Sequence, residues 1–153
     1  MNKHVLCLCA ALVAAPIEAR AQSLPSRPEF GVQVAAALSG GNNFAIGGRI
    51  RYPFSLTAPA PINAIADVNL FLGNTTVADI NWNLVYNFVP HSEFRPYAGG
   101  GVNLSTGGGN TRFGANAVGG FDLGHVGRLA PYLEGRYTFF SLDSFIITFG
   151  VRF

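Results

Sequence analysis

Three consecutive residues, His91, Ser92 and Glu93, are of the types that hydrolases use as base, nucleophile and acid. Side chains of these types catalyse acyl transfer when each hydrogen-bonds to the next across a fold. Neighbours in sequence do not face one another in that way, and Pro90 and Pro96 flank the three residues as they would a turn. The sequence therefore favours a solvated turn here and predicts no catalytic residues and no enzyme.

Metal and cofactor sites are not indicated either. Cys7 and Cys9 lie in one apolar run near the start of the chain, and His125 stands apart from other metal-ligating residues. The glycine run Gly99–Gly101 lacks the Lys and the following helix of a phosphate-binding loop. Glycine at these positions favours a strand that bends or fits beside a bulky neighbour. We expect no metal and no cofactor.

Nine charged residues each lie inside a segment in which apolar and polar residues alternate. They are Arg49, Arg51, Asp67, Asp79, Arg112, Asp122, Glu134, Arg136 and Arg152. Five arginines and four acids nearly balance in charge. If they share an enclosed space, two interpretations are open: a structural network of ion pairs, or the lining of a narrow ion path.

The alternation predicts β-strands. It is clearest in Ala78–Phe88, where even positions are apolar or aromatic and most odd positions are polar. A strand places these two sets on opposite faces. Seven more segments alternate in the same way: Phe30–Ser39, Phe44–Tyr52, Ile62–Leu72, Tyr97–Ser105, Arg112–Leu123, Pro131–Phe140 and Phe145–Phe153. Turn-like joints rich in Gly and Asn separate several of them.

The composition indicates which face meets which solvent. The chain is 49% hydrophobic and 12% charged, about half the charge of a typical soluble domain. The apolar face is unbroken in every predicted strand, and eight strands of about ten residues fit a transmembrane β-barrel. Tyr52, Trp82, Tyr86 and Phe88 could form girdles at the membrane interfaces. A soluble eight-stranded barrel or sandwich that holds an apolar ligand stays open as the alternative.

The N-terminal residues predict export. Lys3 and His4 precede the apolar run Val5–Ala15, and an A-x-A cleavage pattern follows at Ala19–Ala21. These features are typical of a signal peptide, here residues 1–21, which would leave residues 22–153 as one domain. That domain has eight arginines and seven acidic residues, no cysteine and no lysine, so it is nearly neutral. A basic patch for nucleic acid is not indicated.

The last strand and two internal segments resemble a known family. Phe145–Phe153 alternates apolar residues and ends on Phe, which resembles the assembly signal of Gram-negative outer-membrane barrels. The resemblance assigns that role to Phe145, Phe149, Val151 and Phe153. The segments "FRPYAGGGVNLS" (Phe94–Ser105) and "APYLEGRYTF" (Ala130–Phe139) are similar to small barrels of the OmpA-like, OmpX-like and opacity-protein family.

This resemblance implies an all-β fold, an eight-stranded antiparallel up-and-down transmembrane barrel in the outer membrane, with both chain ends in the periplasm. It also implies partners: outer-membrane lipid and lipopolysaccharide, the barrel assembly machinery and periplasmic chaperones, with the folded protein monomeric. Family members often carry long outer loops, whereas the joints here are short, which disfavours an adhesin. Because eight strands enclose a lumen that side chains nearly fill, we expect a structural role. A narrow ion or small-solute channel, a lipid-modifying enzyme and a soluble ligand-binding barrel are the alternatives.

Overall fold

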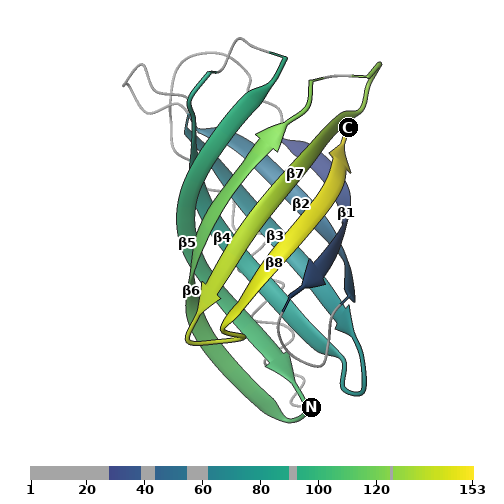
Figure 1. The fold of residues 1–153 in the computed structure, drawn as a ribbon, viewed down its shortest axis with the longest axis vertical. Coiled ribbons are helices and arrows are strands. Elements are labelled where there is room, and N and C mark those ends of the chain that lie inside the picture. Colours follow the sequence, from purple (N-terminus) through teal and green to yellow (C-terminus); the bar gives the residue numbers. More distant parts are fainter. Residues whose placement is uncertain (1–27, 39–43, 55–61, 90–92, 125) are drawn as a thin grey trace.

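The computed structural model describes residues 28–38, 44–54, 62–89, 93–124 and 126–153, which form a closed barrel of eight antiparallel strands in sequence order (Figure 1). The strands are β1 (Glu29–Ala37), β2 (Phe44–Phe54), β3 (Ile62–Leu72), β4 (Val77–Asn87), β5 (Arg95–Gly107), β6 (Asn110–Asp122), β7 (Ala130–Phe139) and β8 (Ser144–Arg152). Each strand lies within two residues of its predicted bounds, so the predicted all-β, up-and-down barrel is confirmed. The predicted signal peptide, residues 1–21, lies outside the described residues.

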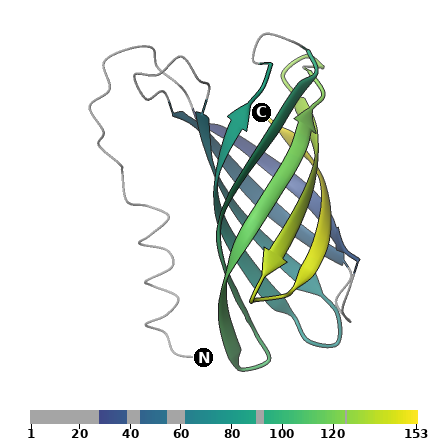
Figure 2. The same cartoon turned by 60° about the vertical axis from the view of Figure 1, so that its left-hand side comes forward.

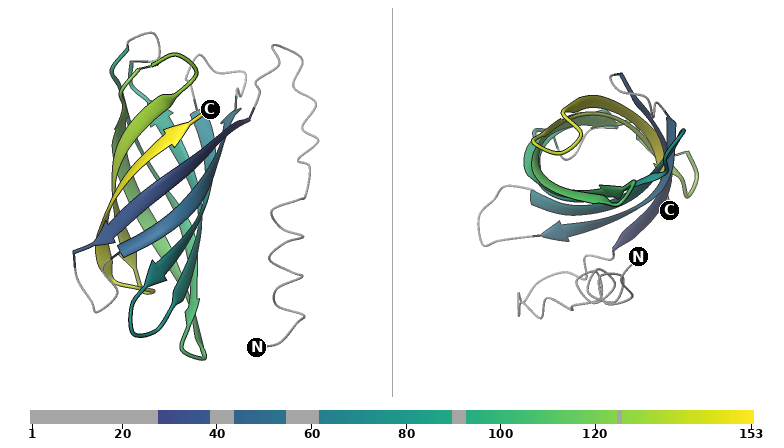
Figure 3. Two further views of the ribbon diagram at one scale, coloured as in Figure 1. Left: turned by 90° about the vertical axis from the view of Figure 1, so that its right-hand side faces the viewer. Right: turned by 90° about the horizontal axis from the view of Figure 1, so that it is seen from below.

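The barrel closes where the last strand meets the first. β8 pairs with β1 in antiparallel register, with Phe149 opposite Val34. The backbone N–H of Phe153 donates to the carbonyl oxygen of Phe30 at 2.8 Å, so the end of the chain joins the ladder. Figures 2 and 3 show the tilted strands enclosing one interior. Because the barrel is closed, it has no edge strand. The backbone N–H and C=O groups of each strand can therefore pair with neighbouring strands and need no water.

The two faces of the wall differ in polarity. In β1, Val32 and Val34 are exposed on the outside, whereas Gln33 between them is buried. The same alternation runs through the other strands, and among the described strand residues no outward-facing side chain is charged. The buried face carries most of the polar residues. This arrangement rules out the alternative barrel whose apolar face lines the interior.

In the described part of the chain, no helix has the length and apolar character needed to cross a membrane.

Two glycines of β5 let its backbone lie close to β4. A Cβ atom on Gly101 would overlap the carbonyl oxygen of Trp82 and lie 2.7 Å from the Cα of Asn83. A Cβ on Gly99 would overlap the carbonyl oxygen of Leu84 in the same way. Two glycines of the run Gly99–Gly101 are therefore required for the close packing of β5 against β4.

We expect Gly101→Ala to lower the free energy of unfolding by about 1–3 kcal/mol, because the added methyl group overpacks the wall. Gly119→Ala is the matched control, since a Cβ there meets only the carbonyl oxygen of Tyr97 at 3.8 Å. Urea unfolding of the two variants in phospholipid bilayers measures the difference. Equal unfolding midpoints would contradict the close approach of β4 and β5.

The charged lumen as the candidate functional site

An ion cluster at the centre of the lumen joins opposite walls of the barrel. Arg49 of β2 contacts Asp67, its register partner on β3, with Nε 2.6 Å from Oδ1. The Nη2 of the same guanidinium lies 2.7 Å from Oε1 of Glu134 on β7. The three side chains are at most 1% exposed. Charge-assisted hydrogen bonds between side chains this deeply buried are strong, and through them Arg49 connects strands that are not neighbours in the wall.

A second part of the cluster is centred on Asp79 of β4. Arg136 of β7 donates from Nη2 to Asp79 Oδ2 at 2.8 Å, and its Nη1 lies 3.8 Å from Asp67 Oδ2. Asn103 Nδ2 and Ser105 Oγ donate to Asp79 Oδ1 at 3.0 and 2.8 Å. Several donors therefore share the two oxygens of one carboxylate.

A further ion cluster lies towards the barrel end where β8 terminates, the upper end in Figure 1. Asp122 of β6 accepts from Nη1 of Arg51 at 2.7 Å, and its Oδ1 lies 2.8 Å from Nη2 of Arg152. Arg152 Nε is also 3.0 Å from Glu29 Oε2, and Arg95 Nε is 3.7 Å from Asp122 Oδ2. Glu29 and Arg95 were not among the predicted lumen residues, and both are partly exposed.

Two tyrosines line these ion clusters. Tyr97 donates its hydroxyl to Glu134 Oε2 at 2.8 Å, and Tyr132 donates to Gln33 Oε1. The guanidinium carbon of Arg49 lies 4.3 Å from the centroid of the Tyr132 ring, a cation–π contact. Tyr132 shares the parity of Glu134 and Arg136 along β7, so the alternation predicts that it faces inwards. Tyr97 was missed, although it shares the parity of Asn103 along β5.

The structure places eight of the nine predicted charged residues in the buried interior. Arg112 is the exception, because it is exposed and its Nη1 donates to the carbonyl oxygen of Ser141 at 3.4 Å. The reason is strand length: β5 and β6 have 13 residues and the other strands 9 to 11. The β5–β6 hairpin projects past the lower end of the barrel in Figure 1, and Arg112 is the third residue of β6, close to the hairpin turn. Four arginines and four acids remain inside.

Apolar side chains also fill part of the lumen, which the sequence analysis did not predict. One buried cluster contains Ala35, Ala37, Ala45, Phe71 and Ile146, and another contains Ile65, Val85, Tyr97 and Val118. Phe71 pairs with Ala45 near the start of β2, away from the Asp122 end. These apolar side chains offer an ion no ligands in their part of the lumen. The parity of Phe71 with Asn69 was the signal that could have placed it inside.

Some buried polar atoms of the lumen have no protein partner. The Nδ2 atoms of Asn69 and Asn83 and the Nη1 of Arg49 are buried without a hydrogen bond to any described residue. Buried donors of this kind are usually satisfied by internal water or another small polar species. Most, but not all, of the buried polar atoms in the lumen therefore find hydrogen-bond partners within the protein.

The metal-binding and catalytic arrangements considered from the sequence can be compared with the described residues. Among them, no group of three or more His, Cys, Asp or Glu could hold a metal ion. Glu93 is exposed, and His91, Ser92 and His125 lie outside the described residues. The interpretation of His91, Ser92 and Glu93 as a solvated turn therefore stays a prediction.

The four residues assigned to the assembly signal share the outer face of β8. Phe145, Phe149 and Phe153 are exposed and Val151 is half-buried. Phe153 directly follows the last residue of the strand. An outward row of aromatic and branched side chains is thus available to another molecule, while its recognition by assembly machinery stays a prediction.

Comparison with known proteins identifies the fold and not a family. No family model matches the chain, and no curated protein does. The N-terminal β-barrel domain of Pseudomonas aeruginosa OprF aligns with a TM-score of 0.66 and 14% identity, over 82% of this chain and 95% of that one. Neisserial surface protein A aligns with a TM-score of 0.61 and 15% identity, also over 82% and 95%.

A third solved structure, the outer membrane protein OprG from Pseudomonas aeruginosa, has a TM-score of 0.55 and 13% identity, over 82% of this chain and 94% of that one. The predicted resemblance to small outer-membrane barrels is thereby confirmed for the fold. Because fold does not determine function, the role of this chain has to be argued from its own lumen and wall.

Proposed function

We propose that the protein is a small β-barrel of the Gram-negative outer membrane, exported through a cleaved signal peptide, whose charged lumen is a structural core and which contributes to outer-membrane integrity. The observation that carries the proposal is the buried, charge-balanced ion network. Four arginines and four acids pair at distances of 2.6 to 3.8 Å, and all of these pairs except Arg49–Asp67 link strands that are not neighbours in the wall. Removing one member would leave an uncompensated buried charge, so the network favours one closed arrangement of the wall.

The outer wall supports the membrane location. Its described strand residues present apolar and aromatic side chains without charge, among them Phe30, Leu84 and Phe149, each at least 48% exposed. Such a surface is unfavourable in water but suits hydrocarbon. We propose outer-membrane lipid and lipopolysaccharide as its surroundings, the barrel assembly machinery and periplasmic chaperones as its partners in biogenesis, and a monomeric, non-enzymatic barrel without cofactor.

A narrow ion path is the second candidate function. The unpartnered Nδ2 atoms of Asn69 and Asn83 favour it, because such atoms can hold water or an ion inside the lumen. The apolar cluster around Phe71 and Ile146 argues against steady conduction. Porins that carry a water-filled pore have about 16 strands, twice as many as this barrel.

Planar-bilayer recording and a deletion strain test the two candidates together. We expect the purified barrel to show no steady, porin-sized conductance, because ion pairs and apolar side chains occupy its lumen. We expect cells that lack the gene to take up more of a bulky hydrophobic dye, and the restored gene to reverse this. Arg136→Gln and Arg112→Gln are the matched pair for any conductance that appears, since only Arg136 lies in the ion network. Porin-sized conductance would overturn the closed lumen, and unchanged dye uptake would overturn the integrity role.

A further inference from the structure

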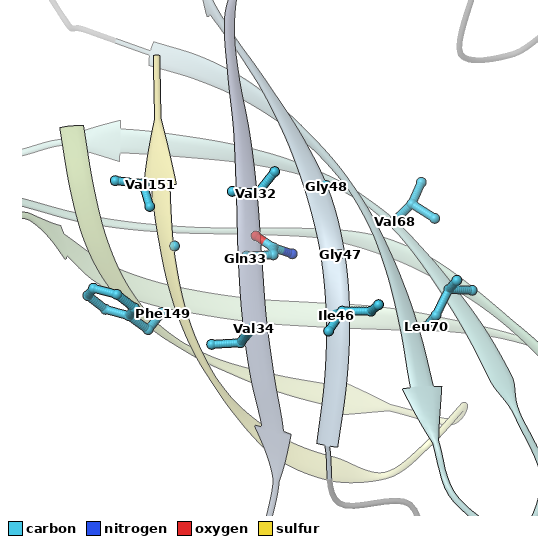
Figure 4. Close-up of a pocket in the computed structure, with 11 residues that line it drawn as sticks. Val32, Gln33, Val34, Ile46, Gly47, Gly48, Val68, Leu70, Phe149 and Val151 are labelled. Carbon is cyan, nitrogen blue, oxygen red and sulfur yellow. The ribbon is translucent and has the colours of Figure 1, made fainter. Parts of the chain in front are cut away.

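A groove crosses the outer wall of the barrel where β8, β1, β2 and β3 lie side by side (Figure 4). Its volume is about 710 Å³. In Figure 4, Val32 and Val34 of β1 flank one side of β2, and Val68 and Leu70 of β3 flank the other. The floor between these two ridges is the backbone of β2 at Gly48. The groove is thus separate from the lumen and opens on the apolar outer face.

The hollow lies over a position without a side chain. Gly48 is the outward-facing residue between Ile46 and Ile50 on β2, and it pairs with Val32 on one side and Val68 on the other. A Cβ atom placed on Gly48 would meet only the carbonyl oxygen of Gly31, at 3.8 Å. The space above Gly48 is therefore open, and the wall around it keeps a regular register.

A second hollow of about 270 Å³ extends the groove across β3 to β4. It shares Gly48 and Val68 with the first and reaches Trp82. The link is Ala66, a small outward-facing residue that pairs with Ile50 and with Trp82. The two hollows are therefore adjacent, and together they make a diagonal path from β8 to the indole of Trp82 on β4.

The width of the path selects its occupant. Adjacent strands lie about 4.8 Å apart, so the ridges on β1 and β3 are about 10 Å apart between backbones, and their side chains narrow the gap further. An α-helix with its side chains is about 10–12 Å across and cannot enter. A chain of methylene groups can, and it gains dispersion contacts with the ridges on both sides.

The chemistry of the lining agrees with the width. Val32, Ile46 and Val68 present branched hydrocarbon, whereas the polar lining residues Gln33, Arg49 and Asp67 are buried and make their polar contacts inside the lumen. The described outward-facing strand residues carry no charge to hold a lipid headgroup. Gly48 also lies near the middle of β2, far from either end of the strand.

We propose that this groove binds one acyl chain of a membrane glycerophospholipid, with its methylene groups over Gly48 and part of its length against Trp82. The proposal rests on the proposed membrane location and adds a lipid site to it. A helix of another protein is too wide to lie between the ridges, so it would bridge them without filling the hollow.

Trp82 provides the probe, because it is the only tryptophan of the chain. The protein is reconstituted in phosphatidylcholine bilayers that contain increasing fractions of phosphatidylcholine with brominated acyl chains, which quench tryptophan on contact. We expect Gly48→Leu, which fills the hollow, to reduce the quenching at low brominated fractions at least twofold. Ala117→Leu is the matched control, because it adds similar volume to an exposed outward position on β6, on the other side of the barrel. Its titration should match that of the wild type.

The outcomes separate the two proposals. If no variant is quenched even in fully brominated bilayers, the membrane location is wrong. If the wild type is quenched and Gly48→Leu follows the same curve, the acyl-chain site is overturned while the membrane location stands. A heat-shift gel verifies that each variant is folded. If Gly48→Leu does not fold, Gly48→Val fills part of the same hollow and must give a smaller reduction in the same direction.

Discussion

Replacing Glu134 by Gln is expected to lower the free energy of unfolding by about 3–5 kcal/mol, because it breaks a buried ion pair by removing one partner. Glu134 accepts from Arg49 at 2.7 Å and from Tyr97 at 2.8 Å, and its side chain is 1% exposed. Gln has the same shape, but it removes the negative charge and turns an NH₂ group towards one of two donors. The charge-balanced interior would then carry an uncompensated guanidinium.

Urea unfolding in phospholipid bilayers, followed by Trp82 fluorescence, measures this effect. Glu29→Gln is the matched control, since Glu29 also pairs with an arginine, but its side chain is 37% exposed. Its partner Arg152 keeps Asp122 at 2.8 Å. Partly exposed pairs contribute about 0–1 kcal/mol, so the control should change little. If the two variants unfold at the same urea concentration, the buried ion pairs of the lumen do not stabilise the barrel more than a partly exposed pair does.

The strands and their sidedness could be predicted because one physical rule governs both. A membrane-spanning strand alternates between two solvents at every residue, so a polar residue inside the wall reveals the parity of the whole segment. In β4, the asparagines between Ile80 and Leu84 fixed which face was buried, and the structure follows that parity along the entire strand. Strand ends were less certain, because turn residues do not mark them to the residue.

The partners of the lumen charges could not be predicted, because parity says which side a residue faces and not what lies across the lumen. Arg49 and Asp67 are register neighbours, but Arg49 and Glu134 are 85 residues apart and meet through the curvature of the closed wall. Arg112 has the inward parity and still lies outside the ion network, since the β5–β6 hairpin extends past the barrel. The lengths of the strands and the closure of the barrel decide these contacts. The alternation of apolar and polar residues predicts neither of them.

The apolar residues of the lumen and the groove on the wall escaped prediction for a related reason. Phe71 and Ile146 have inward parity. Because they are apolar, the pattern does not distinguish them from the apolar residues that face outwards. Gly48 carries no side chain, so it gives no signal in an alternation pattern, although its position between Val32 and Val68 creates the groove. Both features depend on which residues of other strands lie alongside.

Placing an arginine on the outer wall tests the orientation of both faces at once. Val68→Arg is expected to lower the free energy of unfolding in phospholipid bilayers by about 2–4 kcal/mol, the cost of arginine near the middle of the hydrocarbon layer. Val68 is the seventh of eleven residues in β3 and points outwards. Urea titration of folded, reconstituted barrel measures the effect against the wild type.

Leu72→Arg is the control that makes the result specific. Leu72 ends the same strand on the same face, and the two side chains are similarly exposed, 42% for Val68 and 47% for Leu72. If this surface faced water, the two substitutions would lower the free energy of unfolding by similar amounts, because the two positions are similarly exposed. A bilayer distinguishes them by depth, since an arginine near the interface costs only about 0–1 kcal/mol. Equal costs at the two positions would therefore mean that β3 does not span a hydrocarbon layer, and the membrane assignment of the outer wall would have to be abandoned.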